Sequence, residues 1–120
     1  MSKLKALLVD DEIEFVETLA ERLRARGLEV EVANDGPGAV AMIRDGSYGV
    51  VVMDYAMPGM DGLEAVRTMR AEKVNVPFIL LSGQASIKAA RDAARLGAVD
   101  VLEKPTDIAT LLDKINEACG

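Results

Sequence analysis

Short apolar runs alternate with segments of helical periodicity along most of the chain. The runs are rich in β-branched and aliphatic residues, which are typical of strands. They lie at residues 5–9, 29–33, 48–53, 78–81 and 99–102. The helical segments lie at about residues 12–26, 37–44, 63–71, 86–96 and 107–118. This alternation predicts an α/β domain with a parallel sheet and right-handed crossovers.

The composition of single segments agrees with that architecture. The runs at residues 7–9 and 50–53 are continuously apolar, as expected for strands that helices cover on both faces. Gly27 follows the first helical segment, where a left-handed cap would end the helix. The apolar face of that helix is expected to carry Ile13, Val16, Leu19 and Leu23.

Polar residues follow four of the five predicted strands. In an open parallel sheet the carboxyl ends of all strands meet at one edge, so these residues should lie close together. The set comprises Asp10 and Asp11 after the first strand, Asp54 after the third, Ser82 and Gly83 after the fourth, and Lys104 and Pro105 after the fifth. We therefore expect the functional chemistry at this edge.

Three neighbouring carboxylates repel one another, so their cluster predicts either bound protons or a bound cation. Oxygen ligands favour a hard cation, and magnesium is typically held by one or two carboxylates together with water and phosphate oxygens. A carboxylate at such a site can attack phosphorus and form an acyl phosphate. The metal and a lysine would neutralise the charge of the transferred group.

Some of these acidic residues also fit helix caps. Asp11 with Glu14 has the spacing of an N-cap and its reciprocal partner, and Asp10 is a residue type that caps helices. Asp61 with Glu64 has the same spacing but follows no strand. We therefore assign Asp61 to a cap and leave it out of the site.

The remaining candidates have structural interpretations as well. Asp54 and the Ser82-Gly83 pair are suited to turns, and Lys104 taken alone reads as a solvated surface charge. Their joint placement after different strands is what favours a shared site over these separate interpretations.

Length and charge narrow the class of protein further. The 120 residues and 12.8 kDa fit one domain, residues 1–120. No apolar run approaches the ~20 residues of a membrane span, and we expect a cytoplasmic protein with no membrane association. With no histidine and one cysteine, Cys119, the usual zinc sites, histidine-dependent triads and internal disulfides are excluded. The net charge of −6 argues against direct nucleic-acid binding.

At these residues the chain resembles the receiver domain of two-component response regulators, including single-domain chemotaxis regulators. The resemblance covers essentially the whole sequence. It rests on residues 7–12 (LLVDDE), 52–62 (VMDYAMPGMDG), 81–83 (LSG), 97–98 (GA) and 104–105 (KP). It implies a flavodoxin-like, doubly wound three-layer sandwich whose five-stranded parallel sheet has the order 2-1-3-4-5.

The resemblance also implies roles for individual residues. Asp54 would be the phosphoacceptor, and Ser82 and Lys104 would contact the phosphoryl group. Magnesium, or manganese in its place, would be held by Asp10, Asp11, Asp54 and the backbone carbonyl of Ala56. The Lys104-Pro105 bond would be cis.

The implied partners are a phosphohistidine donor and a downstream effector. The donor would be a sensor histidine kinase or a histidine phosphotransfer protein, and this chain, which has no histidine, cannot be its own donor. The protein would thus be a signalling phosphoprotein of a phosphorelay that assists its own phosphorylation and dephosphorylation, and not a turnover enzyme. Ala56 and Gln84 would flank the acyl phosphate and govern water access.

Two residues depart from the common family pattern. Val101 occupies a position that usually carries tyrosine or phenylalanine, and Thr106 replaces a frequent phenylalanine. Both changes bear on how phosphorylation reaches a partner. The family's partner surface consists of the fourth helix, the fifth strand and the fifth helix, and the fourth helix carries Lys88, Arg91 and Arg95 on one face.

Three other classes fit the sequence less well. A haloacid-dehalogenase-like phosphohydrolase would need a second carboxylate where this chain has Ala56. A flavodoxin-like cofactor binder would need a phosphate loop after the first strand. A receiver-like interaction domain that is never phosphorylated would be expected to lack some of the five site residues, all of which are present here.

Overall fold

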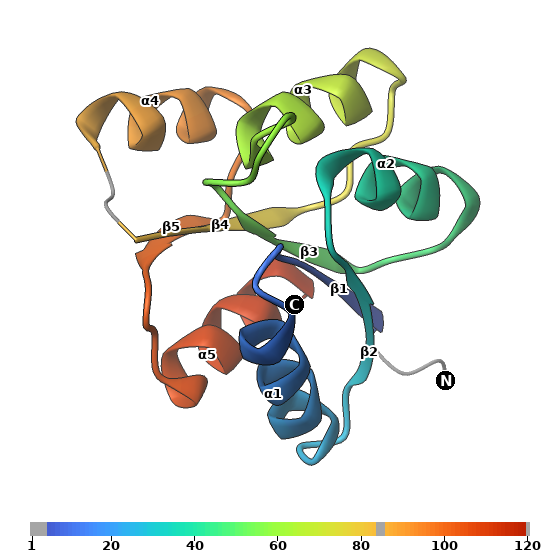
Figure 1. Ribbon diagram of the computed structural model, residues 1–120, viewed down its shortest axis with the longest axis vertical. Coiled ribbons are helices and arrows are strands. Elements are labelled where there is room, and N and C mark those ends of the chain that lie inside the picture. The colour runs from blue at the N-terminus through green and yellow to red at the C-terminus, as the bar shows by residue number, and fades with distance from the viewer. Residues whose placement is uncertain (1–4, 84–85, 120) are drawn as a thin grey trace.

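Five parallel strands form one sheet in the order β2-β1-β3-β4-β5. The computed structural model describes residues 5–83 and 86–119 (Figure 1), so Gln84 lies outside the described residues. The strands are β1 (Lys5–Val9), β2 (Glu29–Ala33), β3 (Val50–Asp54), β4 (Phe78–Ser82) and β5 (Asp100–Glu103). The helices are α1 (Ile13–Arg24), α2 (Gly36–Asp45), α3 (Gly62–Ala71), α4 (Ile87–Arg95) and α5 (Ile108–Cys119). The predicted strand order and the alternation of strands and helices are confirmed.

Helices cover both faces of the sheet and make a three-layer sandwich (Figure 1). Helices α1 and α5 lie on one face, and α2, α3 and α4 lie on the other. Each face of the sheet has its own apolar cluster, and alternate residues of the central strands contribute to one or the other. Met53 packs toward α3, and Val52 packs toward α1 and α5. All five residues of β3 and of β4 are buried. Their continuous hydrophobicity is therefore explained by two-sided burial.

Several helix ends have the side chains that the sequence suggested. Asp61 accepts a hydrogen bond from the Glu64 N–H at 2.9 Å in a complete capping box, which confirms its assignment to a cap. Gly27 has a φ of 91°, as predicted for a left-handed residue after α1. The Asp11 cap did not form, because the N-cap of α1 is Glu12 and its side chain makes no capping hydrogen bond.

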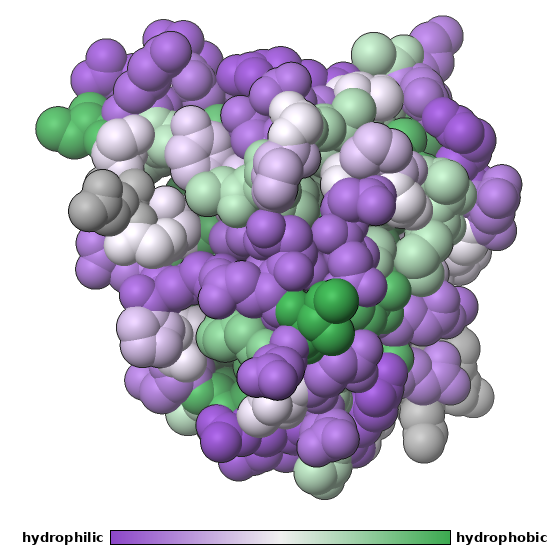
Figure 2. Space-filling view, viewed as in Figure 1, coloured by the Kyte–Doolittle hydropathy of each residue, from purple (hydrophilic) through white to green (hydrophobic). Residues whose placement is uncertain are grey.

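One predicted core position is wrong. Ile13 is 60% exposed, whereas Val16 and Leu23 are buried. Since α1 begins at Ile13, this residue precedes the turns that pack on the sheet. The surface seen in Figure 2 is largely hydrophilic, with small and separate apolar areas. Within the described residues, no helix combines the length and hydrophobicity needed to cross a membrane.

Candidate functional site

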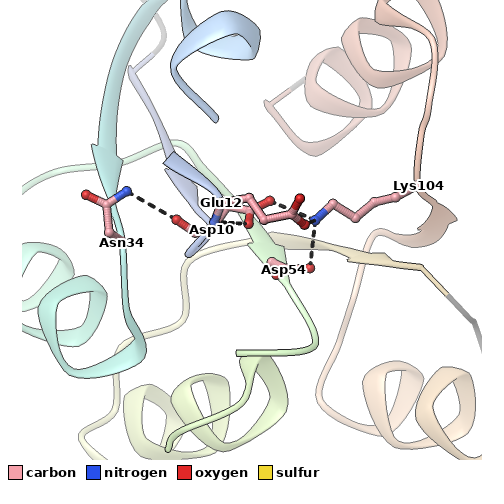
Figure 3. Close-up of polar contacts among 5 residues, drawn as sticks. All are labelled: Asp10, Glu12, Asn34, Asp54 and Lys104. Atoms are coloured by element: carbon pink, nitrogen blue, oxygen red, sulfur yellow. Dashed lines mark hydrogen bonds and ion pairs between the residues drawn. The ribbon is translucent and has the colours of Figure 1, made fainter. Parts of the chain in front are cut away.

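The end of β1 presents two aspartates to the carboxyl edge of the sheet. Asp10 is buried, and its backbone is fixed at both polar groups. Its N–H donates to the carbonyl of Ala33 at 3.1 Å, and its own carbonyl accepts from the Asn34 amide at 3.2 Å (Figure 3). The Asp10 carboxylate accepts from the Glu12 N–H at 2.9 Å. These contacts fix the end of β1 beside the end of β2 and hold the Asp10 carboxylate against the start of α1.

Asp54 is the last residue of β3 and is only 3% exposed. The strand continues straight into the site because the Tyr55 N–H donates to the carbonyl of Leu81 at 2.8 Å. Helix α3 begins directly against this turn, with the Gly62 N–H donating to the carbonyl of Tyr55 at 2.9 Å. A Cβ on Gly62 would collide with the carbonyl oxygen of Asp54, so glycine is what allows this approach.

Lys104 enters the site from the end of β5. Its N–H donates to the carbonyl of Ser82 at 2.9 Å, and the Lys104-Pro105 bond is cis as expected. Ser82 is buried at the end of β4, at the same edge of the sheet. The Lys104 ammonium lies 2.9 Å from Asp10 Oδ2, 3.0 Å from Glu12 Oε1 and 3.2 Å from Asp54 Oδ1 (Figure 3). One cation therefore serves three carboxylates.

The acidic residues converge as a set of oxygen donors. Asp10, Asp11 and Asp54 each offer one carboxylate oxygen, and these oxygens lie within 4.8 Å of one another. Asp10 Oδ2 is buried and accepts no hydrogen bond of good geometry from any described residue. The Lys104 ammonium, 2.9 Å away, is the cation that it pairs with. A buried carboxylate oxygen in this condition is poorly compensated. The donor set fits a hard cation such as Mg²⁺.

Burial and charge set the protonation of the two central groups. Burial raises the pKa of Asp54 to about 6, with the Asp10 carboxylate adding to the rise and Lys104 opposing it. Burial would lower the pKa of Lys104, but its contacts with the Asp10 and Glu12 carboxylates outweigh that effect and the pKa lies above its usual value. Lys104 is therefore a permanent cation, while Asp54 is a carboxylate whose charge is costly in the absence of further positive charge.

A cavity of about 340 Å³ opens over Asp54. It is lined by Glu12, Phe15, Asp54, Ala56, Gly83, Lys104 and Pro105. The volume accommodates a phosphoryl group with its water and metal ligands, so the acceptor carboxylate is buried and yet reachable from one side.

The predicted residues thus meet at one edge of the sheet. Asp10, Asp11, Asp54 and Lys104 form the cluster, Ser82 ends the neighbouring strand, and Ala56 lines the cavity.

Three further residues lie at the site and were not predicted from the sequence. Asn34 follows β2 at the same edge, so the rule that found the others also points to it. Glu12 is adjacent to the acidic pair, but only its contact with Lys104 shows that it belongs to the site. No sequence signal marks Phe15, whose ring lies near Lys104.

Comparison with known proteins agrees with this geometry. Residues 6–116 match the family model described as the response regulator receiver domain. The chain is 37% identical over 112 residues to the regulatory protein AtoC of Escherichia coli (strain K12), covering 93% of this chain and 23% of AtoC. It is 33% identical over 111 residues to the transcriptional regulatory protein FixJ of Rhizobium meliloti (strain 1021), covering 92% of this chain and 54% of FixJ. The chain therefore spans about a quarter and about half of these two relatives.

Solved structures of the same kind superpose closely. The crystal structure of FixJ-N has a TM-score of 0.91 at 32% identity, covering 99% of this chain and 95% of that one. A response regulator protein from Burkholderia pseudomallei, solved with a phosphorylated aspartic acid, a calcium ion and citrate, has a TM-score of 0.86 at 26% identity, covering 94% of this chain and 66% of that one. Together with the family match over residues 6–116, these likenesses show that the chain belongs to the receiver-domain family of two-component response regulators.

Proposed function

We propose that this chain accepts a phosphoryl group on Asp54 from a phosphohistidine of a sensor histidine kinase or a histidine phosphotransfer protein. The observation that carries the proposal is the position of the Lys104 ammonium, 3.2 Å from the buried Asp54 carboxylate and 2.9 Å from Asp10. A carboxylate that is buried beside one fixed cation and one acidic pair is suited to receive a group that brings both negative charge and a metal.

The proposed transfer is a displacement at phosphorus. An Asp54 carboxylate oxygen forms the new bond, the phosphorus–nitrogen bond of the donor breaks, and the donor imidazole nitrogen keeps the bonding electrons. Lys104 would balance the charge of the phosphoryl oxygens, and Ser82 would donate a hydrogen bond to one of them. The cavity lined by Ala56 and Gly83 gives the donor access from one side.

Asp10, Asp11, Asp54 and the backbone carbonyl of Ala56 would hold the divalent cation. When bound, Mg²⁺ supplies the positive charge that a phosphoryl group needs beside three carboxylates. The convergence of the three carboxylates supports this assignment. The Burkholderia relative, whose structure was solved with a phosphorylated aspartic acid and a calcium ion, also supports it. Manganese has the same oxygen preference and could take the place of magnesium.

The same site would hydrolyse its own product. Because Ala56 is small and lines the cavity, water can approach the acyl phosphate from the open side. The phosphate should therefore disappear after the donor is removed. A protein that keeps its phosphate undiminished for days in folded form, while it loses it quickly once unfolded, would contradict self-dephosphorylation.

The output would be altered binding of an effector protein or domain at the surface of α4, β5 and α5. Lys88, Arg91 and Arg95 are all exposed on α4. Of these three side chains, only Arg95 forms an ion pair within the described residues, with Asp92 at 3.8 Å. We expect Arg91→Glu with Arg95→Glu to weaken effector binding without changing phosphorylation. Equal affinity of the wild type and this variant for the effector would remove the claim.

Val101 bears on how strongly the site and this surface are coupled. It is partly buried against the apolar cluster under α4, and its β-branched side chain has few rotamers to exchange. We expect coupling at the low end of the usual ~1 to 3 kcal/mol. Amide shifts on addition of beryllofluoride should grow in α4 and β5 when Val101 is replaced by tyrosine, and equal shifts in the two proteins would contradict this.

The decisive experiment is the intact mass after incubation with Mg²⁺ and acetyl phosphate. The wild type should gain one phosphate, and Asp54→Asn, which keeps the shape of the side chain, should gain none. A control without Mg²⁺ should show little incorporation. Phosphate on the Asn variant would overturn the assignment of Asp54. The donor is expected in the cytoplasm, and this chain would then act there too.

A further inference from the structure

The Lys104 ammonium is enclosed by four groups from three parts of the chain. Three are the carboxylates of Asp10, Glu12 and Asp54, and the fourth is the ring of Phe15, whose centroid lies 4.7 Å from Nζ. The Lys104 side chain is only 12% exposed. Its position over Asp54 therefore depends on what these four groups do when the site is in use.

Phosphorylation would change the contacts of some of these four groups with Lys104 but not of others. Asp10 and Asp54 belong to the acidic cluster, so a metal and a phosphoryl group would change their contacts with Lys104. Glu12 and Phe15 lie at the start of α1 and are not in that cluster. They can keep the same contact with Lys104 before and after transfer.

Of these two, the ring provides the more durable contact. The Glu12 side chain is 65% exposed, and an ion pair with so exposed a partner is screened by water and salt. The attraction of an ammonium for an aromatic face is strongest where the cation is shielded from water, as Lys104 is. We infer that Phe15 is a positioning residue for phosphoryl transfer, holding the Lys104 ammonium in place over Asp54 through the face of its ring.

Ordinary core packing does not account for Phe15. The buried face of α1 consists of Val16, Ala20 and Leu23, and neither apolar cluster of the described residues includes Phe15. Phe15 instead lines both the cavity over Asp54 and a second cavity of about 420 Å³ between α1 and Pro105. It is therefore a wall of the site and not part of the interior.

The inference rests on the proposed phosphorylation of Asp54. Two substitutions of Phe15 distinguish the effect of its aromatic face from the effect of its apolar bulk. Phe15→Leu keeps an apolar side chain but has no aromatic face, whereas Phe15→Tyr keeps the face. With acetyl phosphate at saturating Mg²⁺, we expect the initial phosphorylation rate to fall roughly threefold to tenfold in the Leu variant and to be largely recovered in the Tyr variant. Ile13→Ala, on the same turn of α1 but 60% exposed, is the matched control for a general disturbance of the helix.

A second measurement reports on the contact itself. The ring current of Phe15 should shift the ε-CH₂ protons of Lys104 upfield in the wild-type NMR spectrum and in Phe15→Tyr, but not in Phe15→Leu. The Mg²⁺ affinity should be the same in all three proteins, since Phe15 offers no metal ligand. Urea unfolding of each variant shows whether a rate change merely follows from lost stability.

The outcomes are distinct. An unshifted Lys104 resonance in the wild type, a Leu variant as fast as the wild type, or equal losses in the Leu and Tyr variants would each overturn the role of Phe15. If the wild type takes up no phosphate at all, the proposed function fails, while the Lys104 resonance still decides whether the ring holds the ammonium.

Discussion

Near the amino edge of the sheet, the partly buried charges of Arg70 and Glu31 have several partners each, whereas at the carboxyl edge one ammonium is shared by three carboxylates. Near the amino edge, the Arg70 guanidinium donates to the carbonyls of Leu96, Val74 and Val76 at 3.3, 2.9 and 3.0 Å and lies over the ring of Phe78. At the carboxyl edge, Asp10 Oδ2 lacks a well-formed hydrogen bond within the described residues.

The pKa values of ionisable groups at the two edges also differ. Toward the amino edge, Glu31 accepts from Tyr48 and pairs with Lys5, both at 2.7 Å. Burial, together with the Glu31 hydrogen bond, raises the pKa of Tyr48 to about 12, so the phenol stays neutral. By contrast, burial raises the pKa of Asp54 to about 6. Arg70 and Glu31 near the amino edge are thus compensated by their partners, and the carboxyl edge gains most from added positive charge.

The largest effect is expected from crowding the carboxyl edge. Gly62→Ala would press a methyl group against the carbonyl oxygen of Asp54. We expect a loss of about 3 kcal/mol in the free energy of unfolding, because the obstacle is backbone and cannot rotate away. Urea denaturation measures it. Gly83→Ala, where no atom lies within 4 Å of the added carbon, is the stability control, and equal losses for the two variants would contradict the account.

The next effect comes from breaking the amino edge. Arg70→Met removes the donors for three carbonyls and should cost about 2 kcal/mol in the free energy of unfolding. The rate of phosphorylation should not change, since Arg70 lies at the opposite edge from Asp54. Arg67→Met is the control on the same helix, because the Arg67 side chain is exposed and its 3.7 Å pair with Asp92 is worth little. Slower phosphorylation in the Arg70 variant alone would show that the edges are not independent.

A pH series sharpens the comparison at Asp54. The folded-state pKa of about 6 exceeds the usual 3.8, so the folded protein binds the proton more tightly than the unfolded chain does. The wild type should therefore lose stability relative to Asp54→Asn as the pH rises from about 4 to about 6, and the difference should then stay level. The shift from 3.8 to about 6 corresponds at most to about 3 kcal/mol in the free energy of unfolding.

A control for that series should show the opposite sign. Hydrogen bonds from the Thr110 backbone and hydroxyl hold the pKa of Asp107 below its usual value. Asp107→Asn should therefore be less stable than the wild type near neutral pH, with the difference fading as the pH falls below about 4. A constant difference between the wild type and Asp54→Asn across the series would mean that Asp54 is not destabilised by its own charge.

The smallest effect concerns the exposed member of the acidic cluster. Asp11→Ala should weaken Mg²⁺ binding by roughly fivefold to tenfold, or ~1 to 1.4 kcal/mol, and leave Asp54 able to accept phosphate at high Mg²⁺. Isothermal titration measures the affinity. Glu14→Ala removes an exposed carboxylate of the same region that lies outside the cluster. Unchanged Mg²⁺ affinity in the Asp11 variant would remove this residue from the metal site.

Much of the fold followed from local pattern. The apolar runs located all five strands because two-sided burial leaves a continuous hydrophobic signal, and the bounds of β1 and β2 were predicted to the residue. Asp61 predicted the N-cap of α3 and Gly27 predicted the end of α1, because capping is decided by residues that are close in the chain. The parallel topology then brought Asp10, Asp54 and Lys104 together, although Asp54 and Lys104 are 50 residues apart.

The sequence could not predict where each side chain points or which residues it contacts. Ile13 fits the apolar face of a helix by spacing, yet it is exposed because α1 starts at that residue, before the helix packs on the sheet. Phe15 looked like an ordinary apolar residue, and only the path of the β5–α5 connection sets its ring beside Lys104. Periodicity depends on the helix alone, whereas these contacts depend on where separate elements meet. The sequence by itself therefore determined the layers and the edge at which the chemistry lies, and the tertiary structure decided which groups surround the one cation there.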